Sequence, residues 1–231
     1  MTLNIPRHKN ISIQILKDIY ADTSISSFLG FKGGTAAYLF YDLPRFSVDL
    51  DFDLLNQEKE NDIFLKVKKI IQEYGQLKEA RKKRFTLFFL LSYEKGIQNI
   101  KVEINRHNFN SQYEIKTYLG ISMLAMNKED MAANKLIAMQ ERIGRSNRDI
   151  FDVHFFLKNN WPINNKLIEK RLNLTFEKFL QKCISSLEKI ENRMILAGIG
   201  ELLDAKQKAW VKGHLKEDTL FLLRLKLEEK K

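Results

Sequence analysis

The chain has little cysteine, proline or glycine, with 1, 3 and 10 of these residues among 231. A single cysteine, Cys183, cannot form an internal disulfide, which favours a reducing compartment and a packing role for this side chain. No stretch has the bias of a low-complexity linker. Any domain boundary is therefore expected in a short, ordered connection.

Long apolar runs and metal-ligand spacings are also missing. The longest apolar runs, residues 87–91 and 195–199, are far too short to span a bilayer, and the polar residues 1–10 lack the apolar core of a signal peptide. We therefore expect a cytoplasmic protein. The four histidines are scattered, so a zinc site is not expected.

Hydrophobic residues make up 44% of the chain, enough for a substantial core, and 39 basic against 29 acidic residues give a net charge of +10. This charge favours a polyphosphate or nucleic-acid partner, although a solvated basic face would give the same balance. The densest basic run, residues 78–84, is the better candidate for phosphate contacts.

Hydrophobic periodicity divides the chain into a mixed first half and a helical second half. In the first half it predicts strands at residues 28–31, 46–55, 85–93 and 97–105, and helices around residues 11–19, 35–41 and 60–74. From Asn127, a plausible N-cap with Asp130 as its capping-box partner, it predicts helices at residues 128–143, 148–158, 165–172 and 175–187, with one or two more after residue 190.

Three acids alternate with apolar residues in the predicted strand at 46–55. Asp49 and Asp51 flank Leu50, so both carboxylates point to one side, with their Cα atoms about 7 Å apart. Paired carboxylates are the ligands that Mg²⁺ prefers when it also binds a triphosphate. Taken alone, the pattern is more typical of the polar face of a half-exposed strand.

A double glycine precedes a predicted helix shortly before these acids. Backbone N–H groups of Gly33 and Gly34, and the positive end of the helix that follows Thr35, can hold phosphates. A cradle for phosphates and a metal clamp together meet the needs of nucleotidyl transfer, which depends mostly on positioning and electrostatics. Taken separately, the glycines could form an ordinary tight turn and Thr35 could be an N-cap.

A third acid, Glu103, lies in a predicted strand between Val102 and Ile104. It could bind a metal or help to deprotonate an attacking hydroxyl. A surface position on the strand explains it equally well, so both interpretations stay open.

These motifs are similar to those of the AbiEii/AbiGii nucleotidyltransferase toxins, a branch of the polymerase-β-like superfamily. The resemblance lies in Phe-Lys-Gly-Gly-Thr-Ala-Ala at residues 31–37, Arg-Phe-Ser-Val-Asp-Leu-Asp-Phe at residues 45–52, and a second signature formed by Asp130, Lys135, Arg142, Arg148, Asp149 and Asp152. It implies an α+β fold, with a catalytic nucleotidyltransferase domain at residues 1–122 and a helical domain at residues 123–231 that completes the active-site cleft.

The resemblance also implies roles for individual residues. Asp49 and Asp51, with Glu103 as a possible third ligand, would bind Mg²⁺ or Mn²⁺. The nucleoside triphosphate would contact Gly33, Gly34, Thr35, Arg45, Ser47 and Arg142. Lys135, with Asp149 or Asp152, would complete the catalytic surface.

Helix geometry supports part of the second signature. Lys135 and Arg142 are two turns apart on one helix face, and Asp149 and Asp152 share a face at i and i+3. The same residues could instead be structural: Asp149 could complement the helix dipole, and the two cations could lie on the surface.

The predicted function is therefore that of a toxin in a toxin–antitoxin or abortive-infection (phage defence) system. It would transfer a nucleoside monophosphate to a hydroxyl, with the 3′ end of tRNA as the leading acceptor, and a neighbouring gene would encode its antitoxin. A protein or small-molecule acceptor, or a non-catalytic module that binds nucleic acid or antitoxin, are the alternatives.

Overall fold

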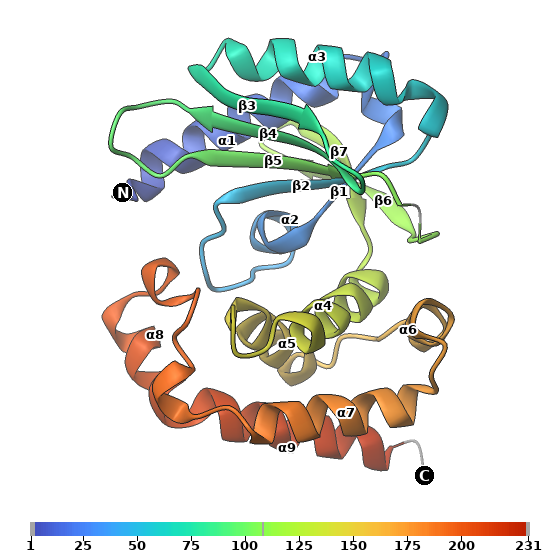
Figure 1. Cartoon of the computed structure of the whole chain (residues 1–231), viewed down its shortest axis with the longest axis vertical. Coiled ribbons are helices and arrows are strands. Elements are labelled where there is room, and N and C mark those ends of the chain that lie inside the picture. Colours follow the sequence, from blue (N-terminus) through green and yellow to red (C-terminus); the bar gives the residue numbers. More distant parts are fainter. Residues whose placement is uncertain (1–2, 108, 230–231) are drawn as a thin grey trace. The chain divides into compact units, whose positions relative to one another are not determined.

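The computed structural model describes residues 3–107 and 109–229, which form two compact units, Met1–Met126 and Asn127–Lys231 (Figure 1). The boundary follows the last strand of the first unit, whereas the sequence places it between residues 122 and 123. The difference arises because residues 121–126 form a strand that the sequence analysis does not predict. No helix in the described ranges is both long and apolar enough to cross a membrane.

The first unit is a mixed sheet with helices on both faces. In chain order its elements are α1 (Ile5–Ala21), η1 (Ser26–Phe28), β1 (Leu29–Lys32), α2 (Gly33–Phe40), β2 (Asp49–Leu54), η2 (Gln57–Lys59), α3 (Glu60–Gln72), β3 (Gln76–Lys82), β4 (Thr86–Ser92), β5 (Ile100–Asn105), β6 (Tyr113–Tyr118) and β7 (Ile121–Met126). The predicted strands and helices of this half are present, with bounds that differ by a few residues. β3, β6 and β7 are additional to the prediction.

The seven strands of the sheet are ordered β3-β4-β5-β2-β1-β7-β6. β2 lies near the centre, parallel to β5 and antiparallel to β1, so its side chains have a neighbouring strand on each side. Helices α1 and α3 cover one face of the sheet, and α2 lies on the other (Figure 1). The α1/α3 face is the apolar one, where Phe52 of β2 meets Tyr20 of α1 and Phe89 of β4 meets Phe64 of α3.

The second unit is helical, as the sequence predicts. Its elements are α4 (Lys128–Arg142), α5 (Arg148–Lys158), α6 (Asn165–Leu172), α7 (Phe176–Glu188), η3 (Asn192–Met194), η4 (Gly200–Leu202), α8 (Ala205–Trp210), the π-helix η5 (Val211–Leu215) and α9 (Lys216–Glu228). α4 packs against α5, α6 and α7, and α9 packs against α5 and α7. Cys183 is fully buried in α7, which fits a packing role, and burial raises the pKa of its thiol to about 12.

Helix caps explain why the sequence places these helices well. Asn127, Asn164 and Thr175 each accept a hydrogen bond from a backbone N–H in the first turn of the helix that follows. At α4, Asn127 Oδ1 accepts a hydrogen bond from the N–H of Asp130, which is one half of the expected capping box. The carboxylate of Asp130 is buried and accepts a hydrogen bond from Asn164 Nδ2 at 2.6 Å, which ties α4 to the start of α6.

The basic run at residues 78–84 forms most of the edge strand β3 and the turn into β4. Its charges have local partners: Arg81 and Lys83 pair with Glu79, and Lys82 pairs with Glu60 of α3. The density of charge therefore reflects an exposed strand at the edge of the sheet. Its expected role in binding phosphate stays a prediction.

Candidate functional site

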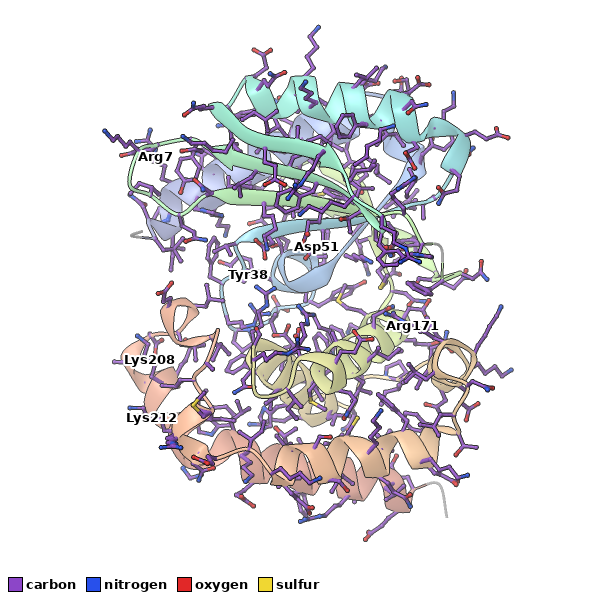
Figure 2. All side chains as sticks on the ribbon, viewed as in Figure 1. Arg7, Tyr38, Asp51, Arg171, Lys208 and Lys212 are labelled. Atoms are coloured by element: carbon purple, nitrogen blue, oxygen red, sulfur yellow. The ribbon has the colours of Figure 1, made fainter. Side chains whose placement is uncertain are left out.

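The acids of β2 share one face of the sheet, opposite the apolar face. Strand register places Asp49 beside Lys101, Asp51 beside Glu103 and Asp53 beside Asn105, all on parallel β5. The other neighbour of Asp51 is Lys32, the last residue of β1. Asp51 lies on the side of the sheet where α2 is found (Figure 2). The fold thus brings Asp49, Asp51 and Glu103 onto one surface.

The double-glycine turn lies directly against these acids. Gly33, the first residue of α2, has a φ of +81°, and a Cβ added there would overlap Asp51 Oδ2. A Cβ on Gly34 would stand 2.7 Å from Ser47 Oγ and 3.0 Å from Arg45 Nη2. Gly33 therefore needs glycine for its backbone conformation and for its close approach to Asp51, and a side chain at position 34 would displace Ser47 or Arg45.

Two side chains hold the backbone on either side of Asp49. Thr35 Oγ1 donates a hydrogen bond to the carbonyl of Asp49, and His8 Nε2 lies 2.9 Å from the carbonyl of Val48. The other ring nitrogen of His8 is 3.1 Å from the hydroxyl of Tyr93. Burial lowers the pKa of His8, so the ring is neutral at pH 7 and donates one hydrogen bond. His8 has no motif around it, and the sequence analysis does not select it.

The carboxylates of Asp49 and Asp51 have different surroundings. Asp49 is 7% exposed, and its Oδ2 lies 3.5 Å from Lys101 Nζ. Asp51 is half-buried. Lys101 is a further residue that the sequence analysis misses, although its position two residues before Glu103 places it on the same face.

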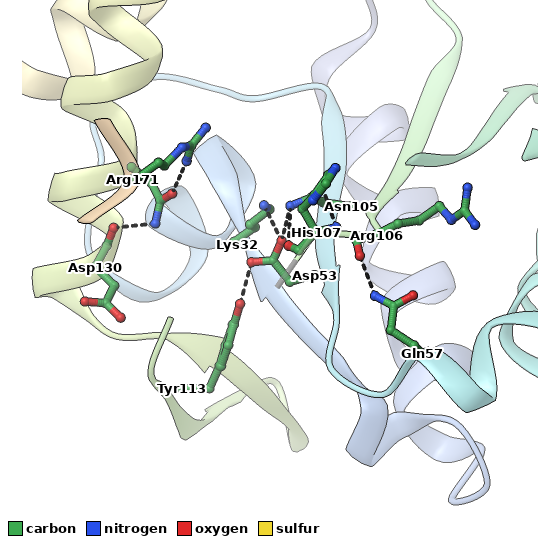
Figure 3. Close-up of polar contacts among 10 residues, drawn as sticks. Lys32, Asp53, Gln57, Asn105, Arg106, His107, Tyr113, Asp130 and Arg171 are labelled. Carbon is green, nitrogen blue, oxygen red and sulfur yellow. Dashed lines mark hydrogen bonds and ion pairs between the residues drawn. The ribbon is translucent and has the colours of Figure 1, made fainter. Parts of the chain in front are cut away.

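Asp53, the third acid of β2, belongs to a closed hydrogen-bond network (Figure 3). Its carboxylate accepts hydrogen bonds from Tyr113 Oη and from Asn105 Nδ2, the latter at 2.9 Å, and it pairs with Lys32 Nζ. The ring of Tyr113 reaches it by crossing Gly30, where a Cβ would overlap the ring. This network fixes Lys32, the residue before the double glycine, and so supports the turn.

The donor set fits a hard divalent cation. Asp49 and Asp51 offer carboxylate oxygens on one face, and Mg²⁺ is commonly bound through one or two carboxylates together with phosphate oxygens and water. Within residues 3–107 and 109–229, no group of three or more His, Cys, Asp or Glu side chains is arranged to hold a metal ion. Glu103 as a third ligand stays a prediction.

The second predicted group forms a buried ion-pair cluster within the helical unit. Lys135 Nζ of α4 lies 2.9 Å from Asp149 Oδ1 and 2.7 Å from Asp152 Oδ2, both on α5, and Arg142 Nη2 lies 3.1 Å from Asp149 Oδ2. Both aspartates are fully buried, and Lys135 is 9% exposed. The i, i+3 and i, i+7 spacings therefore bring all four residues together.

The turn between α4 and α5 is held by Asn147. Its Oδ1 accepts a hydrogen bond from the N–H of Gly144 at 3.0 Å, and its Nδ2 donates to the carbonyl of Met194 at 2.7 Å. These bonds fix where α5 begins, and thereby where Asp149 stands relative to Lys135.

Comparison with solved structures shows the same fold in two proteins of Helicobacter pylori. JHP933 is 22% identical with a TM-score of 0.60, covering 99% of this chain and 96% of its own. A candidate nucleotidyltransferase is 21% identical with a TM-score of 0.61, covering 100% and 99%. They bear out the α+β fold with a mixed sheet. A search of curated protein sequences finds no significant match.

A family model for the nucleotidyl transferase AbiEii toxin of type IV toxin–antitoxin systems matches residues 14–222. This range includes both the Gly-Gly and Asp-x-Asp motifs of the first unit and the Lys135 cluster of the second. The chain therefore belongs to the AbiEii family of nucleotidyltransferase toxins.

Proposed function

We propose that this toxin uses Mg²⁺ or Mn²⁺ to transfer a nucleoside monophosphate from a nucleoside triphosphate to the 3′ end of tRNA, releasing pyrophosphate. The observation that carries the proposal is the placement of Asp49 and Asp51 on one face of β2, with the Gly33 turn against Asp51. A cation site and a phosphate cradle thus adjoin.

Each part of the first unit has a role in this reaction. Asp49 and Asp51 hold the cation, and the first N–H groups of α2 at Gly33 and Gly34 face the phosphates. Arg45 is 3% exposed and lies against Gly34, where its guanidinium can contact a phosphate oxygen, and Ser47 lies beside it. Thr35 contributes by holding the carbonyl of Asp49.

The bound cation would neutralise charge that develops on the phosphate oxygens. Glu103, the neighbour of Asp51 on β5, would accept the proton of the attacking hydroxyl or bind a cation. Further candidates lie in the second unit, where Lys135, Asp149, Asp152 and Arg142 form the ion-pair cluster described above.

An RNA acceptor is favoured by the net charge of +10. Modification of the 3′ end of tRNA would prevent aminoacylation and so block translation, which suits a toxin used in abortive infection or phage defence. This reaction would take place in the cytoplasm. A type IV system also implies an antitoxin, which we expect a neighbouring gene to encode.

The test is to incubate purified protein with each labelled nucleoside triphosphate, Mg²⁺ and total tRNA. We expect label on tRNA with the wild-type protein and at least a thousandfold less with Asp49→Asn or Asp51→Asn, since these remove charge where the cation binds. Asp62→Asn is the matched control, because the side chain of Asp62 on α3 is 61% exposed.

The other outcomes separate the alternatives. Label on protein or on a small molecule would show that the acceptor is not tRNA, while the nucleotidyl-transfer reaction itself would stand. If no nucleotide is transferred to any acceptor and Asp49→Asn remains toxic on expression, the non-catalytic binding module becomes the better account.

A further inference from the structure

A group of exposed rings lies beside the start of β4 and the end of β5, outside the site described above. The ring of Phe85 is 4.9 Å from the ring of His107, which is 5.9 Å from the ring of Phe109 at an interplanar angle of 22°. The guanidinium of Arg84 lies over the Phe85 ring, 4.9 Å from its centre. We call these four residues the ring platform.

The platform is not part of the core. Phe85 is 48% exposed, and Arg84 and His107 are exposed as well. Exposed rings gathered in one patch, unlike a single exposed ring, mark a surface that contacts a partner.

The backbone beneath the rings is held firmly. Arg106 donates its N–H to the carbonyl of Phe85 at 2.9 Å, and its guanidinium donates to the carbonyls of Lys83 and Arg84 and pairs with Glu60 at 2.7 Å. Gln57 binds the carbonyl of Arg106 (Figure 3). The rings therefore stand on a preorganised support, which lowers the entropic cost of binding.

The platform is connected to the acid face of the sheet. Asn105 Nδ2 donates both to Asp53 and to the carbonyl of His107, and Asn105 Oδ1 accepts from the N–H of His107 (Figure 3). Asp53 is two residues beyond Asp51 on β2, about 7 Å along the strand. A chain lying along this face could reach both places.

We propose that the ring platform binds single-stranded RNA by stacking an unpaired base on the exposed ring of Phe85, with Arg84 contacting the backbone. Exposed rings beside cations are the features that bind single strands, because every base has a π-face and every link carries a negative charge. The choice of RNA rests on the proposed function, in which the acceptor is an RNA end. The platform would hold nucleotides near that end.

The test is equilibrium binding of a short fluorescent RNA to the Asp51→Asn protein without nucleoside triphosphate, so that no transfer reaction is needed. Three probes of equal length are compared: oligoadenylate, an abasic strand with the same number of phosphates, and the duplex of oligoadenylate with its complement. We expect oligoadenylate to bind most tightly, because the abasic strand has no bases to stack and the bases of the duplex are paired within its helix.

Substitution of Phe85 gives the decisive comparison. Phe85→Ala should weaken oligoadenylate binding about tenfold or more and leave the abasic strand unchanged, whereas Phe85→Trp should retain binding. Phe221→Ala on α9 is the matched control, since Phe221 is also exposed, at 65%. Thermal melting of each variant checks that folding is intact.

Equal affinity of the wild type for the abasic and base-containing strands would overturn the platform, and so would unchanged binding by Phe85→Ala. Tighter binding of the duplex would also overturn it. If the platform binds RNA as expected but tRNA accepts no nucleotide, the acceptor assignment fails and the platform stands. If nucleotide is transferred to tRNA but Phe85→Ala leaves RNA binding unchanged, the platform fails and the acceptor assignment stands.

Discussion

Gly33 lies so close to Asp51 that its identity should be decided by the carboxylate as well as by backbone conformation. Gly96, in the β4–β5 connection, offers a matched comparison: both have a φ of +81°, but a Cβ on Gly96 would meet nothing within 4 Å. Each Gly→Ala change should cost about 1–2 kcal/mol of stability for the left-handed conformation.

Only Gly33→Ala should also displace Asp51. We therefore expect nucleotidyl transfer to fall by at least tenfold in Gly33→Ala and to stay near wild type in Gly96→Ala, measured at a temperature where both remain folded. Equal activity of the two variants would show that the close approach to Asp51 does not matter for the reaction.

His154 of α5 predicts a pH dependence of stability. Burial lowers its pKa from 6.5 to about 4, with Asp218 raising it and Lys158 lowering it to smaller extents. Above pH 6.5 the ring is neutral in both states. As the pH falls from 6.5 toward 4, the unfolded chain takes up a proton that the folded protein excludes. The free energy of unfolding therefore decreases by at most about 1.4 kcal/mol per pH unit over this range.

This decrease should be visible in urea unfolding of the wild-type protein at about pH 7 and pH 5. His154→Gln should lose less stability between these conditions, because glutamine does not titrate. His214→Gln, at an exposed position of the same unit, should behave like the wild type. An identical pH dependence in all three would contradict the prediction.

At the scale of elements, the contact between α4 and α5 depends on charge pairing. Lys135→Met would leave Asp149 and Asp152 buried without their shared partner, although Arg142 would still pair with Asp149. We expect a loss of about 3–5 kcal/mol, as found when one member of a buried ion pair is removed.

A second substitution separates charge from packing. Lys135→Met combined with Asp152→Asn removes one of the two carboxylates and should recover part of the stability. Chemical unfolding of both variants measures the difference. If the double variant is no more stable than Lys135→Met, loss of lysine packing rather than uncompensated charge is the cause.

The elements also show what a sequence can and cannot predict. Helices α4 to α7 are well predicted, because Asn127, Asn164 and Thr175 mark their starts and their apolar faces have a regular period. The edge strands β3 and β6 are missed, since edge side chains face water: β3 reads as a run of charge, and β6 carries Ile115 at 76% exposure.

The residues of the candidate site likewise divide into those that the sequence predicts and those that it does not. Motifs identify Asp49, Asp51 and the glycines, because their spacing is local. The pairing of Asp51 with Glu103, and the placement of His8 behind Val48, depend on which strands and helices become neighbours. No local pattern contains that information, so His8, and the contact of Lys101 with Asp49, emerge only from the three-dimensional structure.

For the whole molecule, the net charge of +10 predicts how binding of tRNA responds to salt. Cations that replace counterions on phosphates make the logarithm of the association constant fall linearly with the logarithm of salt concentration. Filter binding between about 50 and 200 mM salt measures this slope. An affinity that does not change with salt would argue against recognition of the phosphate backbone.

Strand β2 performs two tasks with alternate residues, since Leu50, Phe52 and Leu54 build the apolar layer while Asp49, Asp51 and Asp53 face the other way. Insertion or deletion of one residue within it would exchange the two sets, placing carboxylates in the core and hydrocarbon where nucleotides are expected. The length of this strand should therefore be under stronger selection than the identity of its apolar residues. Loss of folding and loss of toxicity would then arise from a single event.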